Sequence, residues 1–163
     1  MYPPKAQFSK GFSLLELILV LTLLGILGLV GTMGFIHFSR GFIFAKETTA
    51  VTAKGQLAMM RLAKELQSLS AASTATPTRL AFTALRGGGE ENHESQLVGT
   101  TLLFDNQVLV DQVRGLALNY HTAYDSTASP WSDEIRIIQI NLTLEGPGNT
   151  PIDLQTRVAL RNM

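Results

Sequence analysis

The hydrophobic residues of this chain follow one pattern near the N-terminus and another afterwards. From Phe12 to Phe38 almost every side chain is apolar, and Glu16 is the one charged residue between Lys10 and Arg40, with histidine counted as neutral. As a helix this run would be roughly 40 Å long, against a bilayer hydrocarbon core of about 30 Å. It is also longer than the ~7–15-residue apolar core of a secretory signal. The pattern therefore predicts a transmembrane helix over residues 12–38.

The chain beyond Arg40 remains compatible with a helix, because no proline occurs before Pro77. Apolar residues recur at intervals of three and four with polar residues between them, and they form two rows: Leu57 and Met60 in one, Met59, Leu62, Leu66 and Leu69 in the other. The serines and threonines before Pro77 compete with helical backbone. We therefore predict an amphipathic continuation of the helix over 39–73, with the methionines filling the core.

After Pro77 the apolar period changes to two, which is typical of strands. Strands are predicted over 79–85, in a hairpin over 100–113 that turns at Asp105-Asn106, and over 115–124, 134–146 and 153–161. The apolar phase slips between Ile137 and Ile138, which predicts a β-bulge there or a strand buried on both faces. An antiparallel sheet over 78–163, packed on the second half of the helix, gives an α+β fold.

Composition narrows the function without identifying it. The chain has 163 residues, 13 basic and 13 acidic side chains, and no cysteine. A formal charge of zero gives no basic surface for nucleic acid, and the lack of cysteine excludes disulfides and thiolate metal sites. We therefore expect one modest domain with an anchor.

The start of the apolar run carries a recognisable motif. Residues 10–28 read KGFSLLELILVLTLLGILG, and this stretch resembles the cleavage and methylation signature of type IV prepilins and type II secretion pseudopilins. The resemblance implies a leader over 1–11 whose basic residues are Lys5 and Lys10. It implies cleavage after Gly11 and methylation of the new N-terminus at Phe12. It also implies a pilin-like fold, in which the long transmembrane helix continues into a globular β-sheet domain.

Glu16 is the residue of this motif that is energetically unfavourable inside a membrane. A carboxylate at the centre of a membrane helix costs about 2.5–3.5 kcal/mol, so one that is kept there usually has a partner. Cleavage at Gly11 would create an amine that is mostly cationic at neutral pH. In the family this amine, from the same or a neighbouring subunit, pairs with the glutamate, so Glu16 is expected to act in assembly. The alternative is a side chain that only reaches back to the lipid headgroups.

The later part of the chain resembles the same family more loosely. Its order of QLAMMRLAKELQ, a hairpin, IRIIQINLTL and TRVALRN is similar to J-type minor pseudopilins and W-type minor pilins. The chain lacks the paired cysteines of many major pilins, and no acidic calcium loop of major pseudopilins can be placed. The resemblance implies a non-enzymatic minor pseudopilin of a type II secretion filament. The alternatives are a minor pilin of an adhesive, motility or DNA-uptake pilus, and a membrane-tethered binding module or enzyme.

Partners and location follow from the same resemblance. It implies a single-pass protein of the bacterial inner membrane with a cytoplasmic N-terminus and a periplasmic or extracytoplasmic C-terminal domain. Charge does not decide this orientation, because basic residues occur on both sides of the apolar run. The expected partners are the prepilin peptidase, other minor and major (pseudo)pilins, an inner-membrane assembly platform and membrane lipid. No nucleic acid and no cofactor are expected.

One polar stretch could in principle hold a metal. RGGGEENHESQ, residues 86–96, contains Glu90, Glu91, His93 and Glu94, and such oxygen and imidazole ligands can bind a cation. It lacks the Lys-Ser/Thr pair of a phosphate-binding loop. Because no second ligand cluster lies near it in the sequence, we interpret the stretch as a solvated loop. Trp131 is expected to pack its loop on the sheet.

Overall fold

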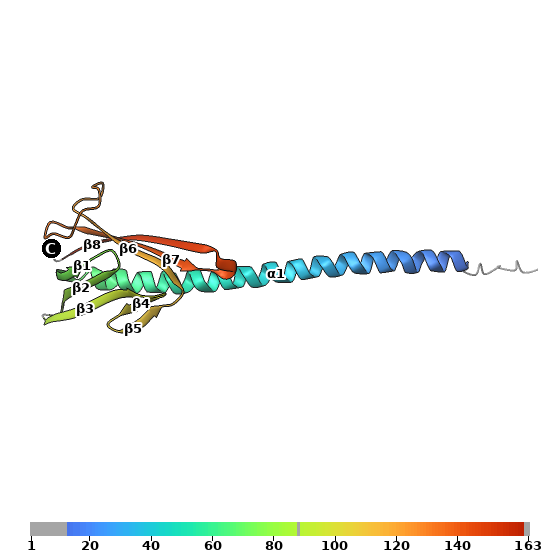
Figure 1. Ribbon diagram of the computed structural model, residues 1–163, viewed down its shortest axis with the longest axis horizontal. Coiled ribbons are helices and arrows are strands. Elements are labelled where there is room, and N and C mark those ends of the chain that lie inside the picture. The colour runs from blue at the N-terminus through green and yellow to red at the C-terminus, as the bar shows by residue number, and fades with distance from the viewer. Residues whose placement is uncertain (1–12, 88, 162–163) are drawn as a thin grey trace, which may run out of the picture. The chain divides into compact units, whose positions relative to one another are not determined.

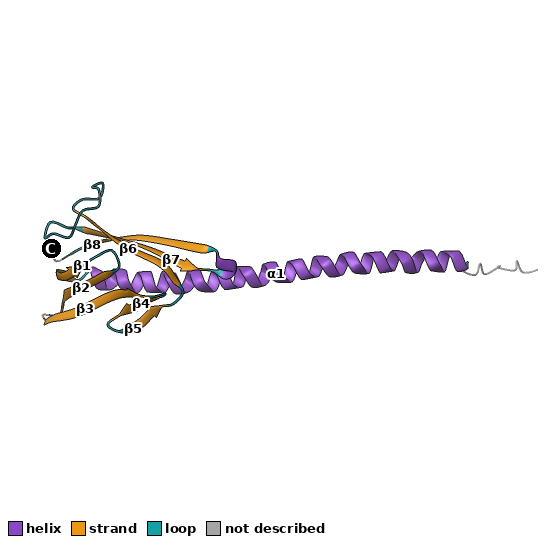
Figure 2. Cartoon of the chain, in the orientation of Figure 1, coloured by secondary structure: helices purple, strands orange, loops and turns teal. Residues whose placement is uncertain are grey.

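A computed structural model describes residues 13–87 and 89–161 of the protein. Within these residues an apolar N-terminal helix is followed by antiparallel strands, which confirms the predicted α+β, pilin-like layout (Figures 1 and 2). The elements are α1 (Leu14–Leu66), β1 (Leu69–Ala75), β2 (Arg79–Arg86), β3 (Gly89–Val98), β4 (Thr101–Phe104), β5 (Gln107–Val110), β6 (Val113–His121), β7 (Ile137–Glu145), the short 3-10 helix η1 (Pro147–Asn149) and β8 (Pro151–Ala159).

The chain divides into two compact units, and the first ends at Ile43. Every leucine, isoleucine, valine, methionine and phenylalanine of α1 from Leu14 to Ile43 is exposed, by 42 to 79%. Such a surface is unfavourable in water, at roughly 25 cal/mol per Å² of apolar area. Among the described residues α1 is the one helix long and apolar enough to cross a membrane. A single N-terminal apolar helix of this kind fits a membrane anchor.

The second unit, from Phe44 onward, contains all the strands of the described chain. They form a five-stranded sheet in the order β1-β2-β3-β4-β5 and a three-stranded sheet in the order β6-β7-β8. All pairings are antiparallel between consecutive strands, so each sheet is a meander. The predicted hairpin turn is confirmed, because Asp105 and Asn106 both have positive φ (51° and 62°), as a two-residue type I′ turn requires.

The helix ends earlier than its sequence pattern predicts. It stops at Leu66, where the Gln67 backbone N–H still donates to the Ala63 carbonyl, and β1 begins at Leu69. The prediction of a helix to residue 73 is therefore wrong, and the β region begins before the predicted residue 78. Tertiary contacts explain this early end of the helix. Leu69 is fully buried, and β1 gains ladder hydrogen bonds from β2. Those bonds satisfy the backbone of a stretch whose serines weaken a helix.

Residues 89–98 correct a second prediction. The stretch interpreted as a solvated loop is mostly β3, which pairs with β2 from Arg86↔Gly89 to Arg79↔Gln96 and with β4 from Ser95 onward. Pairing with β2 supplies ladder hydrogen bonds to the charged part of the strand, so these residues can form a strand that their intrinsic propensity disfavours. The first four residues of β3 are exposed, and Ser95 farther along the strand is fully buried.

The predicted irregularity near Ile137-Ile138 is also wrong. Ile135 is fully buried but precedes β7, and its backbone N–H donates to the Ser132 carbonyl across a turn. Within β7 the buried residues simply alternate: Ile138, Ile140, Leu142 and Leu144. The pairing of β7 with β8 is unbroken, and the register shift of this sheet lies instead in β6, between Val113 and Gly115. The predicted phase of β8 is confirmed, with Val158 buried while Gln155 and Arg157 are exposed.

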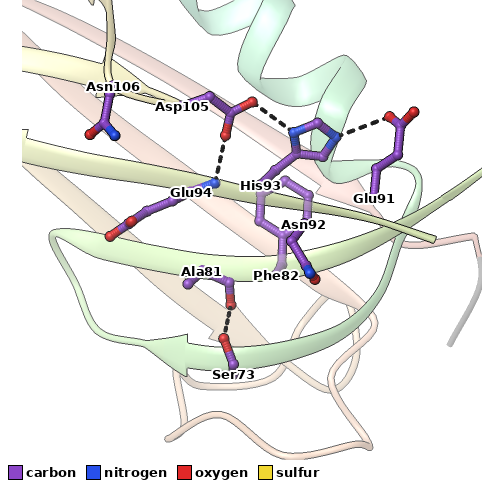
Figure 3. A pocket seen from close by; sticks show the side chains of 9 residues that line it. All are labelled: Ser73, Ala81, Phe82, Glu91, Asn92, His93, Glu94, Asp105 and Asn106. Atoms are coloured by element: carbon purple, nitrogen blue, oxygen red, sulfur yellow. Dashed lines mark hydrogen bonds and ion pairs between the residues drawn. The ribbon is translucent and has the colours of Figure 1, made fainter.

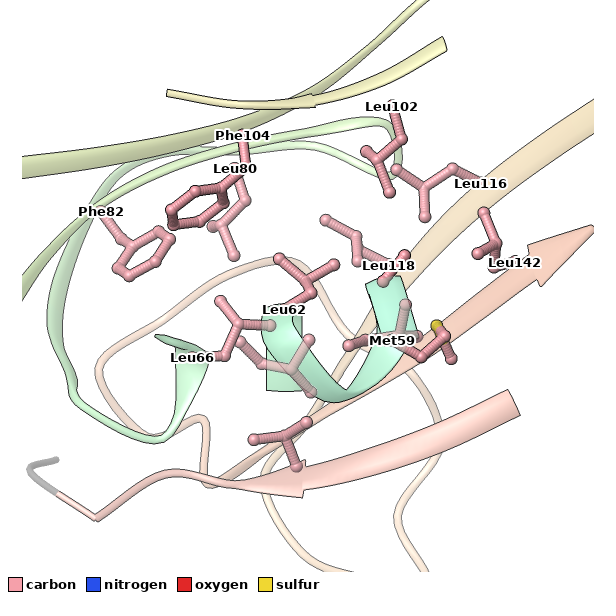
Figure 4. Close-up of a cluster of buried hydrophobic side chains, with 14 of the residues drawn as sticks. Met59, Leu62, Leu66, Leu80, Phe82, Leu102, Phe104, Leu116, Leu118 and Leu142 are labelled. Atoms are coloured by element: carbon pink, nitrogen blue, oxygen red, sulfur yellow. The ribbon is translucent and has the colours of Figure 1, made fainter. Parts of the chain in front are cut away.

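The core lies where the second half of α1 meets both sheets (Figure 4). From the helix it contains Ala58, Met59, Leu62 and Leu66, all at most 6% exposed. Gly55 lies one turn earlier, and an added Cβ there would overlap the δ-methyl groups of Leu144 and Leu154. The helix therefore lies directly on the β6-β7-β8 sheet at this glycine. The other predicted apolar row is not core, because Leu57 and Met60 are 66% and 62% exposed.

Candidate functional site

The first turn of α1 contains Glu16 and a helix cap. Ser13 immediately precedes the helix, and its Oγ accepts a hydrogen bond from the Glu16 backbone N–H at 3.2 Å. The order Ser-x-x-Glu is a capping box, in which the hydroxyl satisfies an N–H that has no partner within the helix. A carboxylate in the first turn also interacts favourably with the helix dipole. Local sequence thus explains both why the helix starts here and why an acid is tolerated in its first turn.

Glu16 has no charged partner in the described part of the chain. Its side chain is exposed, and no basic group of residues 13–87 or 89–161 forms an ion pair with it. A compensating cation would have to come from elsewhere. The other predicted motif residues, Gly11, Phe12, Lys5 and Lys10, lie outside the described residues.

Comparison with protein families identifies the motif at this end of the chain. The model of the prokaryotic N-terminal methylation motif matches residues 7–32, which include Glu16 and the predicted cleavage junction. The match supports a type IV pilin-like protein. Comparison with curated proteins found no match, and comparison with solved structures found none either. Pilin-like proteins are structural rather than catalytic, and the layout of an apolar N-terminal helix followed by antiparallel sheets agrees with this family.

The acidic stretch around His93, interpreted from sequence as a solvated loop and not as a metal site, places its side chains on two sides of β3. Glu94 lies on the outer side of β3 and pairs with Arg79 at 2.5 Å. The His93 ring lies on the core side, with Nδ1 at 2.7 Å from Asp105 Oδ2 and Nε2 at 3.5 Å from Glu91 Oε2 (Figure 3). In the described residues no three His, Cys, Asp or Glu side chains are grouped so that they could hold a metal ion.

The arrangement around His93 instead joins two strands of the sheet. Its ring stacks on Phe104 with centroids 5.4 Å apart, and Asp105 Oδ1 accepts a hydrogen bond from the Glu94 backbone N–H. Asp105 is therefore bonded to β3 through both carboxylate oxygens. Sequence reasoning missed this partner, because it placed Asp105 only as a turn residue. The signal that could have found it was the register of β3 on β4, which places the hairpin turn beside His93.

The loop from β6 to β7 is anchored by an aromatic pair. Trp131 packs edge-on against Tyr120 with ring centroids 5.4 Å apart, which confirms its predicted packing role. The Tyr120 hydroxyl donates to the Thr76 carbonyl at 2.9 Å, and burial raises the pKa of this hydroxyl. His121 ends β6, with Nδ1 at 2.8 Å from the Ser126 carbonyl oxygen. These contacts are structural and hold the loop on the sheet.

Proposed function

We propose that the protein is a minor pseudopilin, a subunit of the filament of a type II secretion system that acts by assembly rather than catalysis. The observation that carries the proposal is the methylation motif over residues 7–32, placed at the start of an apolar helix whose side chains are exposed. A helix of that kind is stable only in lipid or packed against other helices. The looser likeness to J-type minor pseudopilins and the lack of cysteine support the minor subunit.

Processing is the first step of the proposed mechanism. The prepilin peptidase removes residues 1–11, which takes Lys5 and Lys10 away, and methylates the amine of Phe12. The N-terminus lies on the cytoplasmic side of the inner membrane and the β-sheet unit on the periplasmic side. The proposed regions are the leader over 1–11, the filament-core helix over 12–38, its amphipathic continuation from 39, ending at Leu66, and the β-sheet region after it.

Glu16 sets the position of the subunit in the filament. Its carboxylate has no cation within the described chain, so the methylated amine of Phe12, in the same or a neighbouring subunit, is its proposed partner. Two opposite charges neutralise each other in surroundings of low dielectric constant, where either one alone is strongly unfavourable. The pair therefore favours one axial position of a subunit against its neighbours. Other minor and major pseudopilins, the assembly platform and membrane lipid complete the set of partners.

A minor pilin of a type IV pilus is the alternative function. The matched motif supports it equally, because pilins and pseudopilins share the cleavage and methylation signature. Deletion of the gene in its host separates the two: loss of protein secretion with normal pili supports the pseudopilin, and loss of pili with normal secretion supports the pilin. Neighbouring genes for a secretin, a secretion ATPase and several prepilin-like proteins would favour secretion. If the protein is a tethered binding module, its deletion should leave both secretion and pili intact.

Processing itself is tested by mass. The mature chain extracted from membranes should begin at Phe12, and its mass should equal residues 12–163 plus one methyl group. The reason is that the peptidase meets the Gly11–Phe12 junction where the leader enters the membrane. The matched control is the same chain expressed without the peptidase, which should keep residues 1–11. A mature species that still carries Met1 to Gly11 in the presence of the peptidase would contradict the proposal.

A further inference from the structure

The two sheets of the described chain have four edge strands, and one of them differs from the rest. These edges are β1, β5, β6 and β8. An edge strand exposes unpaired backbone N–H and C=O groups, and proteins commonly block such edges with bulges. The pairings of β1, β5 and β6 with their neighbours all contain register shifts. In contrast, β8 pairs with β7 in unbroken register from Pro151 to Ala159. Its nine residues therefore offer a regular template for a further strand.

A groove lies beside this edge. It has a volume of about 390 Å³, with Met59, Met60 and Ala63 of α1 on one side and Leu154 and Thr156 of β8 on the other. Met60 is 62% exposed, and the neighbouring Leu57 is 66% exposed. Apolar groups next to unpaired backbone provide both parts of a strand-docking site, since backbone hydrogen bonds give affinity and side-chain pockets give selectivity.

The outer face of β8 carries a charge pattern that specifies the incoming strand. Asp153 and Arg157 lie on this face with Gln155 between them, and all three are exposed. Asp153 accepts a hydrogen bond from Thr143 Oγ1 at 2.6 Å, and Arg157 Nε donates to Gln139 Oε1 at 2.8 Å. Neither residue forms an ion pair with any described residue. Opposite charges on directly facing residues stabilise a pair of strands, and like charges destabilise it.

We propose that the edge of β8 and its groove bind an extended strand of another filament subunit, antiparallel to β8. The strand directs apolar side chains toward Leu154 and Met60, and it carries a basic residue opposite Asp153 and an acidic residue opposite Arg157. The identity of the partner as a subunit rests on the proposed function. The strand-docking site itself rests on the unbroken edge, the groove and the charges.

The charge pattern provides its own probe. A peptide with the sequence of residues 151–159, PIDLQTRVA, placed antiparallel with its Gln opposite Gln155, sets its Arg opposite Asp153 and its Asp opposite Arg157. The control peptide PIRLQTDVA has the same composition with these two charges exchanged. Fluorescence anisotropy of each labelled peptide with the full chain in detergent micelles measures binding. Because two facing pairs change from attraction to repulsion, we expect the exchanged peptide to bind about tenfold more weakly.

A reciprocal variant distinguishes binding at this site from nonspecific binding of the peptides. The double change Asp153→Arg with Arg157→Asp keeps the net charge, and it should reverse the preference so that PIRLQTDVA binds more tightly. Equal binding of both peptides by both proteins, or no binding, would overturn the site. Self-association of the full chain that Arg157→Asp alone abolishes would show that a second copy is the occupant, which overturns the partner assignment. Removal of the leader is measured separately by mass spectrometry. The proposed function can therefore be contradicted by that measurement while the strand-docking site is still supported by the peptide experiment.

Discussion

At the scale of single residues, Glu16 combines two physical roles. Its backbone N–H is capped by Ser13 Oγ, and its carboxylate lies in the first turn of α1, where the helix dipole favours a negative charge. The proposed ion pair with the Phe12 amine uses the same carboxylate for its charge. A capping box accepts glutamine as well as glutamate, whereas an ion pair does not. Substitutions at these two positions can therefore separate helix capping from filament assembly.

The assembly prediction concerns the charge. We expect Glu16→Gln and Glu16→Leu to be inserted and cleaved normally yet poorly incorporated into filaments, because a buried cation that loses its partner costs about 3–5 kcal/mol. Glu16→Asp should be intermediate, since the charge remains but the reach shortens. The fraction of processed subunit recovered in sheared filaments measures this.

The control for that experiment is Ser13→Ala, which removes the cap, at about 1 kcal/mol, but keeps the charge. Its incorporation should stay close to that of the unchanged chain. If Glu16→Leu assembles normally, the ion-pair mechanism is wrong even where cleavage at Gly11 is found, and the side chain only reaches the lipid headgroups.

Tyr120 predicts how stability depends on alkaline pH. Burial raises the pKa of its hydroxyl above the ordinary value of about 10. Below that value the tyrosine is neutral in both states and its contribution is complete. At higher pH the unfolded chain loses the proton first, so the free energy of unfolding falls as pH rises. Relative to Tyr120→Phe, the chain should lose about 1.4 kcal/mol between pH 8 and pH 11. Denaturant titrations of both proteins at pH 8 and at pH 11 measure their free energies of unfolding. If the difference between the two proteins is the same at both pH values, the raised pKa of Tyr120 is contradicted.

At the scale of elements, the contact between α1 and the β6-β7-β8 sheet depends on Gly55. Alanine normally stabilises a helix interior by up to about 1 kcal/mol relative to glycine. At Gly55, however, the added methyl group would overlap the side chains of Leu144 and Leu154. Both leucines come from strands far away in sequence, and Leu144 is fully buried. Packing against these leucines therefore decides whether the substitution stabilises or destabilises the protein.

We predict that Gly55→Ala lowers the free energy of unfolding of the β-sheet unit by about 1–3 kcal/mol through overpacking. The matched control is Gly41→Ala, another helical glycine, where an added Cβ would meet nothing within 4 Å. Thermal unfolding of the full chain in detergent, followed by near-ultraviolet circular dichroism, compares the two variants. A Gly55→Ala chain as stable as the Gly41→Ala chain would show that the helix can move away from the sheet.

At the scale of the whole molecule, the anchor and the β-sheet unit differ in where their apolar side chains lie. The apolar side chains of α1 up to Ile43 are exposed, whereas the second unit has its own buried core. The exposed apolar surface of the chain therefore lies mainly on the first part of α1, and removal of that part should leave a folded unit. The exposed Leu57 and Met60 remain on that unit as contact surface.

We predict that a chain starting at Phe44 is soluble and binds another minor pseudopilin more strongly than it binds itself. The exposed part of α1 and the adjoining apolar groove supply the contact. Pull-down with the products of neighbouring genes measures partner choice, and sedimentation measures self-association. The control variant Met60→Glu should keep the fold, because Met60 is exposed, but should weaken the contact. A stable homo-oligomer that binds none of these products would favour a tethered module.

The sequence by itself determined the features that depend on residues close together in the chain. The methylation motif, the apolar run with its single acid, the Asp105-Asn106 turn and the alternation in β8 are all local patterns. Each reflects a local physical requirement, such as the length of a bilayer or the positive φ of a type I′ turn. For that reason the anchor, the class of fold and the membership of the pilin-like group could be predicted.

The tertiary structure alone decided what depends on partners far away in sequence. The end of α1 at Leu66 and the formation of β3 follow from strand pairing, which supplies hydrogen bonds that override local propensity. The contact of His93 with Asp105 needs the register of two strands, and the close approach at Gly55 needs the packing of a helix on a sheet. The open edge of β8 exists only because no strand of the described chain pairs with its outer side. These contacts join distant segments, so no local pattern encodes them.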